Sequence, residues 1–488
     1  MAQIYSDLDK TYDLIIVGAG TGGCSTAITA AREGLDVCII DSKGNEGIGR
    51  KVCGDLMGKS IISFINDHLG LDYSDIITNE LNSMDIYSPD GTVIPMPADG
   101  VMIDRYKFGQ AFLNDALKAG CDLKDSCRCN GPVIEEGYVC GVELYDSIQK
   151  KESVIRSRII VDASGASGGF RKKVCGSDSL DTSYLKRDIE PRDMSCSYRQ
   201  IIELKNPLDD VHKGMITLLP EFGGYYWVFP EDEKTANVGI GIACNHKKKI
   251  LKKRLEYIMA EDEIFNGSKI IEGGGGSVPT RRSFYSLVAN GIILVGDAGS
   301  EVNPLTGGGI GPSIGAGYMC AKTAAEAIKN NDVSQNSLWK YNTWYHDPNN
   351  KLRLEYKADL FNGGIHAGRD VIREFVQSIS DADVNWSFKN CVNNSTFSKI
   401  VSADSSLLTP KMKAESLIKG IRNPILLRIG ETMSLMKEMN EIYENYPATP
   451  DMFPGWKKEV ESVDAKFNNI STQSSWGLWL NILSKIFC

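Results

Sequence analysis

The chain has 488 residues, of which 42% are hydrophobic and 24% are charged, and its formal net charge is −9. This length predicts two or three domains, and the negative charge argues against non-specific binding of nucleic acid over the whole surface. No run reaches the roughly 18 consecutive apolar residues of a membrane-spanning helix, and the polar, acidic start of the chain is unlike a secretion signal.

The thirteen cysteines are scattered along the chain, and several occupy positions where a small apolar side chain would serve equally well. This usage is typical of a reducing compartment, so we expect a cytoplasmic protein. Cys127 and Cys129 are too close together and too isolated to form a zinc site, and no metal site is predicted.

The first predicted element is an apolar strand that runs into a glycine-rich turn. Residues 12–17 form the strand, and Gly18, Gly20 and Gly23 follow it at the start of a small-residue helix. Gly18 permits a tight turn, Gly20 lets the backbone approach a pyrophosphate, and Gly23 lets the helix pack closely on the strand. The N–H groups at the positive end of this helix then form an anion site.

A second apolar strand over residues 37–40 ends at Asp41, whose carboxylate would accept hydrogen bonds from ribose hydroxyl groups. The strand, glycine turn, helix, second strand and terminal acid together predict a βαβ unit that binds an adenine dinucleotide. The alternative is an ordinary glycine-rich turn in another kind of α/β protein. The loop over residues 47–55 follows where the cofactor would extend.

The next elements alternate between strands and one helix. A Pro-Asp-Gly turn within residues 85–96 predicts a hairpin. Apolar spacing predicts a helix that begins after residue 105 and ends at Gly120. Strands are then expected over residues 139–145 and 157–161.

Residues from about 190 to 275 predict a separate antiparallel sheet. Its strands are expected at residues 195–204, 214–219, 224–230 and 236–243. The run of four glycines at 273–276 is interpreted as a flexible joint back into an α/β pattern. A strand over residues 291–295, a glycine-rich turn and a helix over 312–328 follow, and the rest of the chain is largely helical, with apolar spacing at 417–436.

Four motifs stand in one order: the glycine fingerprint, Asp104-Arg105, the turn from Asp162 to Gly165, and Gly296-Asp297 with its glycine-rich sequel. Together they resemble the FAD-binding framework of the para-hydroxybenzoate hydroxylase superfamily. Within it, the lysine–cysteine–glycine–aspartate loop and the segments 225–230 and 303–311 resemble archaeal geranylgeranyl reductases, flavoenzymes that saturate isoprenoid chains of membrane lipids. The resemblance covers about residues 10 to 330, and the Ala298-Gly299 pair departs from the paired alanines of the family.

The resemblance implies an α/β FAD-binding fold of the Rossmann-like, glutathione-reductase and para-hydroxybenzoate hydroxylase type. An antiparallel substrate sheet is inserted in it, and a mainly helical region follows. The expected domains are the FAD-binding domain (1–83, 98–188 and 274–330), the substrate and catalytic domain (84–97 and 189–273), and the helical region (331–488) with a membrane-surface tail (475–488).

The residues expected to bind FAD share positions at strand ends, helix starts or glycine turns. They are Gly18, Ala19, Gly20, Thr21, Gly22, Gly23, Asp41, Ser42, Arg50, Cys53, Gly54, Arg105, Asp162, Ala163, Gly165, Gly296, Asp297, Pro304, Gly307, Gly308, Gly309 and Ile310. Asp297 would accept hydrogen bonds from the ribityl chain, and the N–H groups of the glycine turn would stabilise the negative charge of a reduced flavin. Arg105 either reaches the cofactor or is a solvated arginine at a helix start.

Tyr225, Trp227 and Phe229 alternate along a predicted strand and therefore share one face. The resemblance implies that they form the apolar wall of a substrate pocket, and the alternative is that they are sheet core.

Cys53 is the catalytic candidate, because the resemblance places this cysteine beside the flavin ring. Lys51 and Arg50 are expected to lower the pKa of its thiol. An isolated alkene is a poor hydride acceptor, so the reaction needs a proton as well as a hydride. Cys53 is the candidate for substrate positioning or proton relay. The alternatives are that a bound water supplies the proton, or that the thiol only packs in the core.

We therefore expect a flavin-dependent reductase that saturates the C=C bonds of geranylgeranyl chains in archaeal-type membrane lipid precursors by hydride transfer from reduced FAD. The substrate is a geranylgeranyl lipid or diphosphate. Only one dinucleotide fingerprint is present, so no second domain dedicated to NAD(P)H is expected. NADPH could still bind at the surface, and a protein such as ferredoxin is equally open as the electron donor. The alternatives are a flavin-dependent aromatic monooxygenase or halogenase on the same scaffold and, more distantly, a non-enzymatic prenyl-binding escort protein.

Two segments bear on peripheral contact with the inner membrane face. Apolar residues fall on one helical face of the segment 476–487, which predicts either an interfacial helix or a helix docked on the protein's own core. The basic run 247–254 either meets anionic lipid or an acidic electron donor, or is simply a solvated face.

Overall fold

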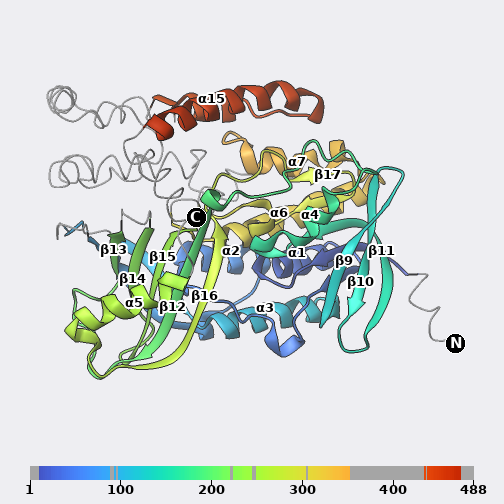
Figure 1. Ribbon diagram of the computed structural model, residues 1–488. Helices are drawn as coiled ribbons and strands as arrows, with labels where there is room; N and C mark the ends of the chain where they lie inside the picture. Colours follow the sequence, from blue (N-terminus) through green and yellow to red (C-terminus); the bar gives the residue numbers. More distant parts are fainter. Residues whose placement is uncertain are drawn as a thin grey trace.

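The computed structural model describes residues 10–87, 93–94, 97–219, 224–244, 249–303, 306–351, 434–435 and 437–473 (Figure 1). Pro304, most of the segment 417–436 and the tail at 475–488 lie outside these residues. The βαβ unit is present as predicted. Strand β1 (Thr11–Val17) leads through the glycine turn into helix α1 (Thr21–Arg32) and strand β2 (Val37–Ile40), and the two strands pair in parallel.

The parallel sheet is built around β1, which is almost wholly buried. Its partners are β2 on one side and β11 (Lys151–Asp162) on the other, and β18 (Ile292–Leu294) and β8 (Asp122–Lys124) extend the sheet outward, all in parallel. Helix α6 (Ile310–Lys329) packs so closely on α1 that a Cβ at Gly317 would lie 2.4 Å from the Gly22 carbonyl oxygen. Because these strands are parallel, the turns that carry the sequence motifs begin at one edge of the sheet.

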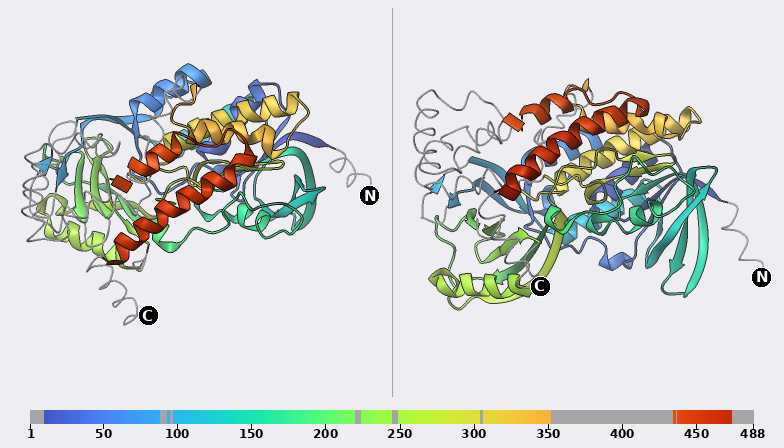
Figure 2. Two further views of the ribbon diagram at one scale, coloured as in Figure 1. Left: turned by 90° about the horizontal axis from the view of Figure 1, so that it is seen from above. Right: turned by 45° about the horizontal axis from the view of Figure 1, so that its top comes forward.

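Antiparallel strands and further helices complete this half of the molecule. Strands β9 (Cys127–Glu135) and β10 (Tyr138–Asp146) pair with β11 as a ribbon, and β17 (Val288–Ala289) pairs with β18. The helices are α2 (Lys59–Leu69), α3 (Arg105–Lys118) and the short α4 (Gly169–Val174). The ribbon lies at the opposite end of the molecule from the second large sheet (Figures 1 and 2).

The second large sheet has seven strands in the order β16-β12-β15-β14-β13-β5-β6. The strands are β5 (Ile86–Tyr87), β6 (Val93–Ile94), β12 (Met194–Glu203), β13 (Met215–Leu219), β14 (Gly224–Pro230), β15 (Thr235–Ala243) and β16 (Lys269–Pro279). All pairs are antiparallel except β13 with β5. Helix α5 (Lys249–Glu261) follows β15 and packs on the sheet.

The interpretation of residues 273–276 as a flexible joint is wrong, because these glycines lie inside β16 and pair with β12. Their small size serves close packing instead. A Cβ at Gly273 would lie 2.9 Å from the Tyr198 hydroxyl, and one at Gly274 would lie 2.7 Å from the Val52 side chain. The glycine run thus lets the loop that carries Val52 approach the sheet.

A three-stranded sheet that the sequence analysis missed joins the two halves. It consists of β3 (Leu56–Gly58), β7 (Pro97–Ile103) and β4 (Ile77–Ser83) in the order β3-β7-β4. Leu81 and Met102 from this sheet form an apolar cluster with Trp227 and Phe229 of β14. The aromatic strand is therefore packed against the sheet whose first strand, β3, directly follows the loop that contains the catalytic candidate.

The C-terminal part returns to the FAD-binding half. Helix α15 (Phe453–Gln473) lies beside α7 (Gln335–His346) in Figure 2, and Trp339 of α7 makes an edge contact with Phe453 at 5.4 Å between ring centroids. Asp464 of α15 pairs with Arg282, which is 9% exposed, and also accepts a hydrogen bond from Tyr285. Within the described residues, no helix combines the length and apolar character needed to cross a bilayer.

Cysteine usage alone indicated a reducing compartment, but the structure contains a disulfide between Cys196 and Cys244. The strands β12 and β15 pair antiparallel with Cys196 opposite Ile242, and this places Cys244 just beyond the paired segment. The two Cα atoms lie 5.1 Å apart, which is within the ordinary range for a disulfide. The inference from cysteine usage therefore did not anticipate this bond.

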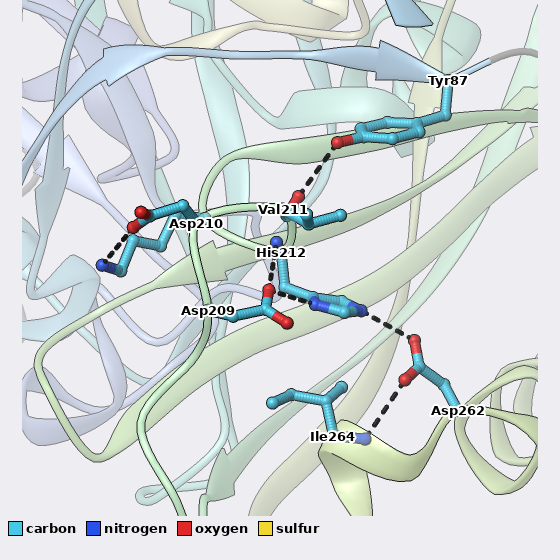
Figure 3. Close-up of polar contacts among 8 residues, drawn as sticks. Tyr87, Asp209, Asp210, Val211, His212, Asp262 and Ile264 are labelled. Atoms are coloured by element: carbon cyan, nitrogen blue, oxygen red, sulfur yellow. Dashed lines mark hydrogen bonds and ion pairs between the residues drawn. The ribbon is translucent and has the colours of Figure 1, made fainter. Parts of the chain in front are cut away.

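A histidine fastens the turn before β13 to the segment after α5 (Figure 3). The Nδ1 atom of His212 lies 2.6 Å from Asp209 Oδ1, and its Nε2 atom lies 2.9 Å from Asp262 Oδ2. Burial of the ring favours a lower pKa, but the hydrogen bonds to Asp209 and Asp262 outweigh it, so the pKa of His212 is raised above its ordinary value of 6.5. The protonated ring can donate to both carboxylates at once.

Because the folded-state pKa of His212 is raised, its stabilising effect is complete below pH 6.5 and is lost as the pH rises through the folded-state value. We expect His212→Ala to lower the free energy of unfolding by about 1 kcal/mol at pH 6. The deficit relative to the wild type should shrink at pH 9, as measured by urea denaturation.

The control is Lys213→Ala, because Lys213 pairs with Asp210 in the same turn and both groups are largely exposed. This variant should match the wild type at both pH values. A His212→Ala deficit that stays equal or grows between pH 6 and pH 9 would contradict the assignment.

Candidate active site

The predicted cofactor residues come together because the strands that precede them are parallel neighbours. The carboxyl ends of β1, β2, β11 and β18 lie along one edge of the sheet. The glycine turn, Asp41, the turn from Asp162 to Gly165 and the Gly296-Asp297 turn begin at that edge. Ligands of open α/β sheets bind at this position.

The glycine turn is tight in the way that its sequence predicts. Gly18 has a φ of +112°, and a Cβ there would lie 2.3 Å from the carbonyl oxygen of Ala163. A Cβ at Gly23 would lie 1.9 Å from the Gly18 carbonyl oxygen. A Cβ at Gly20, in contrast, would meet no protein atom within 4 Å. The turn is closed on the protein side and open where a cofactor phosphate would approach.

Asp41 and Thr21 are held by the protein itself. Asp41 Oδ2 accepts a hydrogen bond from the Ala19 N–H at 2.9 Å, and the side chain is half-buried. The Thr21 hydroxyl lies 2.7 Å from the Ser313 hydroxyl and so links the first turns of α1 and α6. Ser42, the next residue after Asp41, is exposed.

Arg105 is the first residue of α3 and is 8% exposed, so it is not a solvated arginine. Its Nε and Nη1 atoms are buried and have no hydrogen-bond partner among the described residues. A buried guanidinium with unused donors is costly unless an acceptor completes it. Arg105 therefore indicates an oxygen-rich ligand at this edge. Arg50, in contrast, is exposed and lies over the Tyr106 ring at 4.4 Å.

Asp162 is fully buried at the end of β11, and it fixes local backbone. Its carboxylate accepts hydrogen bonds from the Ser164 N–H at 2.9 Å and the Arg171 N–H at 2.8 Å. Gly165 has a φ of +78°, and a Cβ there would meet no atom within 4 Å. This turn therefore presents an open backbone beside the first glycine turn.

The Gly296-Asp297 turn is supported from below by a residue that the sequence analysis missed. Glu301 is fully buried, and its carboxylate accepts hydrogen bonds from the Gly296 N–H at 2.5 Å and the Tyr341 hydroxyl at 2.7 Å. Burial raises the pKa of Glu301 to about 8. Asp297 is 7% exposed and lies 3.3 Å from the Lys51 ammonium group.

The glycine-rich sequel forms the start of α6. Gly307 has a φ of +72°, and Gly309 precedes Ile310, the first residue of the helix. The Gly308 N–H donates to the Thr306 hydroxyl at 3.1 Å. The Tyr225 hydroxyl donates to the Thr306 carbonyl at 2.5 Å, so the seven-stranded sheet contacts this turn directly.

The expectation for Cys53 holds only for Lys51, whose charge does act to lower the pKa of the thiol, while the net pKa is raised. The Cys53 thiol keeps some exposure, yet burial and the nearby Asp55 carboxylate raise its pKa above the ordinary value. The positive charges of Arg105 and Lys51 act in the opposite direction but are weaker. Cys53 is therefore a protonated thiol at neutral pH, which suits a proton donor better than a nucleophile.

Asn237 of β15 is a further residue that the sequence analysis missed, and it joins the cysteine loop to the aromatic strand. Its fully buried amide accepts a hydrogen bond from Trp227 Nε1 at 3.0 Å. Its Nδ2 atom donates to the Cys53 carbonyl at 3.1 Å and to Asp55 Oδ2 at 2.9 Å. A single asparagine in an apolar strand has no sequence signature that would have indicated this role.

Tyr225, Trp227 and Phe229 share one face of β14, as predicted, and their rings follow one another at 5.9 and 6.3 Å between centroids. Trp227 and Phe229 are each 6% exposed, whereas Tyr225 is half-buried. A Cβ at Gly54 would lie 3.6 Å from Phe229 and 3.7 Å from Trp227, so the cysteine loop rests on this aromatic face.

These residues fit an FAD group. Phosphate oxygens would fit the open space at Gly20, and phosphate or hydroxyl oxygens would accept hydrogen bonds from the unused donors of Arg105. The Gly307–Gly309 turn leads into the N-terminus of α6. A bound FAD, once reduced, supplies the hydride of the reaction.

Comparison with known proteins agrees with this geometry. The family model described as FAD dependent oxidoreductase matches residues 13–168, and the model described as geranylgeranyl reductase catalytic domain matches residues 193–278. The digeranylgeranylglycerophospholipid reductase of Sulfolobus acidocaldarius is 32% identical over 472 residues, covering 94% of this chain and 98% of that protein. Digeranylgeranylglycerophospholipid reductase 1 of Methanococcoides burtonii is 33% identical over 77% of this chain and 86% of its own.

Solved structures show the same fold. A geranylgeranyl bacteriochlorophyll reductase-like protein from Thermoplasma acidophilum has a TM-score of 0.65 at 25% identity, covering 82% of this chain and 99% of its own. A flavin-dependent brominase has a TM-score of 0.61 at 15% identity, covering 94% of this chain and all of its own, and this likeness concerns the fold alone.

The fold and the cofactor edge define an FAD-dependent oxidoreductase. The near full-length match to its archaeal relatives then gives the family: the chain belongs to the digeranylgeranylglycerophospholipid reductases. The fold class and the family that the sequence analysis expected are thereby confirmed.

Two glycine substitutions should separate cofactor binding from folding. Gly20→Ala places its methyl group in open space with φ at −79°, so the apoprotein should melt as the wild type does. Because the methyl group points where the pyrophosphate would approach, FAD affinity should fall by roughly tenfold or more. Titration of the apoprotein with FAD, followed by flavin fluorescence, measures this.

The matched variant is Gly23→Ala, whose methyl group collides with the Gly18 carbonyl and should destabilise the apoprotein itself. Unchanged FAD affinity in a well-folded Gly20→Ala protein would show that the cofactor does not lie on this turn.

Proposed function

We propose that this chain saturates the C=C bonds of geranylgeranyl chains in archaeal-type membrane lipid precursors, using a hydride from reduced FAD. The observation that carries the proposal is the junction of the two halves. The cysteine loop follows the cofactor edge and lies directly on the aromatic strand. A Cβ placed on Gly54 of this loop would lie within 4 Å of both Trp227 and Phe229. A prenyl chain on that strand would lie beside the cofactor.

The chain's own residues would bind the cofactor and keep water away from the reacting carbons. The proposed cofactor contacts are those of the sequence analysis, with the open backbone at Gly20 and Gly165 and the unused donors of the Arg105 guanidinium as the clearest of them. Tyr225 is the aromatic residue with the most remaining exposure, so we place the substrate nearest to it. Burial raises the pKa of Tyr225 to about 12, and its hydroxyl stays protonated.

Cys53 is the proposed proton donor, with a water as its rival. An isolated double bond needs a proton on one carbon as the hydride reaches the other. The raised pKa of Cys53 keeps the thiol protonated until that moment. A pocket with little water protects both the reduced cofactor and any developing positive charge.

The electron donor and the membrane contact complete the proposal. NADPH and a ferredoxin-type protein are the two candidate electron donors. The proposed substrate is a geranylgeranyl lipid or a geranylgeranyl diphosphate. The outward face of α5 carries exposed Ile250 and Tyr257, and Arg254 lies 5.5 Å from the Tyr257 ring. This mixed basic and apolar face supports peripheral contact with the inner leaflet.

An oxygen-using activity is the alternative that the sequence analysis named, and the likeness to a brominase concerns the fold alone and adds no support for that activity. An escort protein without chemistry is disfavoured by the cofactor edge, which retains its open glycine turns.

The direct test incubates dithionite-reduced holoenzyme anaerobically with a digeranylgeranyl glycerophospholipid and follows the product by mass spectrometry. We expect the lipid mass to rise in steps of two hydrogens, because each saturated double bond gains one hydride and one proton. Boiled enzyme and a fully saturated lipid are the controls. No mass gain anaerobically, together with oxygen-dependent modification of an aromatic compound, would favour the oxygen-using alternative.

Replacement of Cys53 tests its role separately. Cys53→Ala removes the proposed proton donor and leaves the loop backbone and its Asn237 contact, so the rate constant for alkene saturation should fall by about 10²-fold or more. FAD content and melting temperature should stay near wild-type values. Full activity with an unchanged product pattern would assign the proton to water instead.

A further inference from the structure

Asp55 is a buried acid beside the active-site thiol that the mechanism above leaves unused. It lies two residues after Cys53 and is 3% exposed. Its φ is +58°, a left-handed conformation that non-glycine residues adopt rarely. A protein that holds an aspartate in a strained turn and away from water bears a cost at this position.

The backbone and the carboxyl group of Asp55 both interact with Cys53. The Asp55 N–H donates to Cys53 Sγ at 3.3 Å, and the Asp55 carboxylate interacts electrostatically with the same thiol. Asp55 Oδ2 accepts from Asn237 Nδ2 at 2.9 Å. Asp55 Oδ1 is buried and has no hydrogen-bond partner among the residues that the structure describes.

Charged groups face Asp55 from several elements. Arg199 of β12 places Nη2 at 4.0 Å from Asp55 Oδ2 and at 3.1 Å from the exposed Glu272 of β16, and Arg105 of α3 acts from the cofactor side. Burial nevertheless dominates and raises the pKa of Asp55 to about 6.

A second acid, Glu231, lies close enough to Asp55 for their charges to interact. Glu231 follows β14 and is half-buried. Burial raises its pKa to about 7, and the negative charges of Asp55, Asp232 and Asp104 add to that effect against Arg199. The pKa values of the two interacting carboxyl groups therefore both lie close to neutral pH.

We propose that Asp55 is a positioning residue that holds the Cys53 thiol and returns a proton to it after each saturated double bond, with Glu231 as the link to solvent. This inference rests on the proposed function and on the role of Cys53 in it.

The proton balance is complete. The S–H bond of Cys53 breaks as its proton forms a C–H bond at one alkene carbon, while the hydride from the reduced cofactor forms the C–H bond at the other. The Asp55 carboxylate takes up a proton from solvent through Glu231 and passes it to the thiolate, so Asp55 ends each cycle in the state in which it began. Both electrons that saturate the double bond arrive with the hydride, so Cys53 and Asp55 change only their protonation.

The direction of proton return follows from acid strength. The Cys53 thiol has a raised pKa, so its thiolate is a much stronger base than the Asp55 carboxylate. A thiolate next to Asp55 further increases the proton affinity of that carboxyl group by like-charge repulsion. Proton return to sulfur is therefore downhill.

The test compares wild-type holoenzyme with Asp55→Asn, Asp55→Glu and the control Asp99→Asn, an exposed aspartate that pairs with Lys59. The asparagine keeps the shape and a hydrogen-bond acceptor for Asn237 but carries no exchangeable acid proton. The first readout is the rate of Cys53 alkylation by iodoacetamide as a function of pH, quantified by peptide mass spectrometry. Because the Asp55 charge raises the thiol pKa, Asp55→Asn should shift this profile to lower pH by roughly one unit.

The second readout is rapid-mixing kinetics of reduced holoenzyme with a digeranylgeranyl lipid in excess dithionite, which reduces the flavin again after each double bond. In Asp55→Asn, the first double bond per active site should be saturated within about threefold of the wild-type rate, because Cys53 already carries its proton. Later double bonds should slow by tenfold or more. Asp55→Glu should restore part of the later rate, and Asp99→Asn should match the wild type in both readouts.

An unchanged alkylation profile overturns the proposal, and so does a first turnover slowed as much as the later ones. If Asp55→Asn fails to fold, the Asp55→Glu variant tests the proposal instead. Its rate for the double bonds after the first must then exceed that of Cys53→Ala by more than tenfold. If the wild type saturates no double bond, the proposed function fails and proton return fails with it. The alkylation profile needs no substrate and separates that case from a failure of the Asp55–Cys53 coupling alone.

Discussion

The parallel alignment of β1 with β2 and β11 is the constraint on which the rest of this protein depends. Parallel strands end at the same edge, so three motifs far apart in sequence begin within one short stretch of surface. The alignment is kept close by the absence of side chains at Gly18 and Gly23, where a Cβ would collide with backbone oxygens. Without that close approach, the helix start at α1 and the turns after β11 and β18 would not share one ligand.

The second dependence is the buried amide of Asn237. It accepts from Trp227 and donates to the Cys53 carbonyl and to Asp55, so it fixes the cysteine loop relative to the aromatic strand. Hydride transfer requires that the hydride donor and the apolar wall that binds the substrate be held at a defined distance from each other. One asparagine and the glycines of β16 thus set the geometry between the cofactor half and the sheet half.

Much of the fold could be predicted from the sequence, because its signals are local. The glycine fingerprint and the apolar runs gave the βαβ unit, and the alternation at residues 224–230 gave the shared face of Tyr225, Trp227 and Phe229. The glycines at 273–276 were misinterpreted since composition alone cannot tell a hinge from a strand that is crowded by Tyr198 and Val52. The roles of Asn237 and Glu301, the raised pKa of Cys53 and the Cys196–Cys244 bond depend on contacts between distant segments, which a single sequence does not display.

A reduced flavin at this edge is expected to pass its hydride to an isolated prenyl double bond. Anaerobic photoreduction of the holoenzyme, followed by addition of a digeranylgeranyl lipid, tests it through the return of the oxidised-flavin absorbance. We expect reoxidation with one flavin oxidised per double bond saturated, and no reoxidation by the fully saturated lipid. A flavin that stays reduced with both lipids, or a protein that retains no flavin, would contradict it.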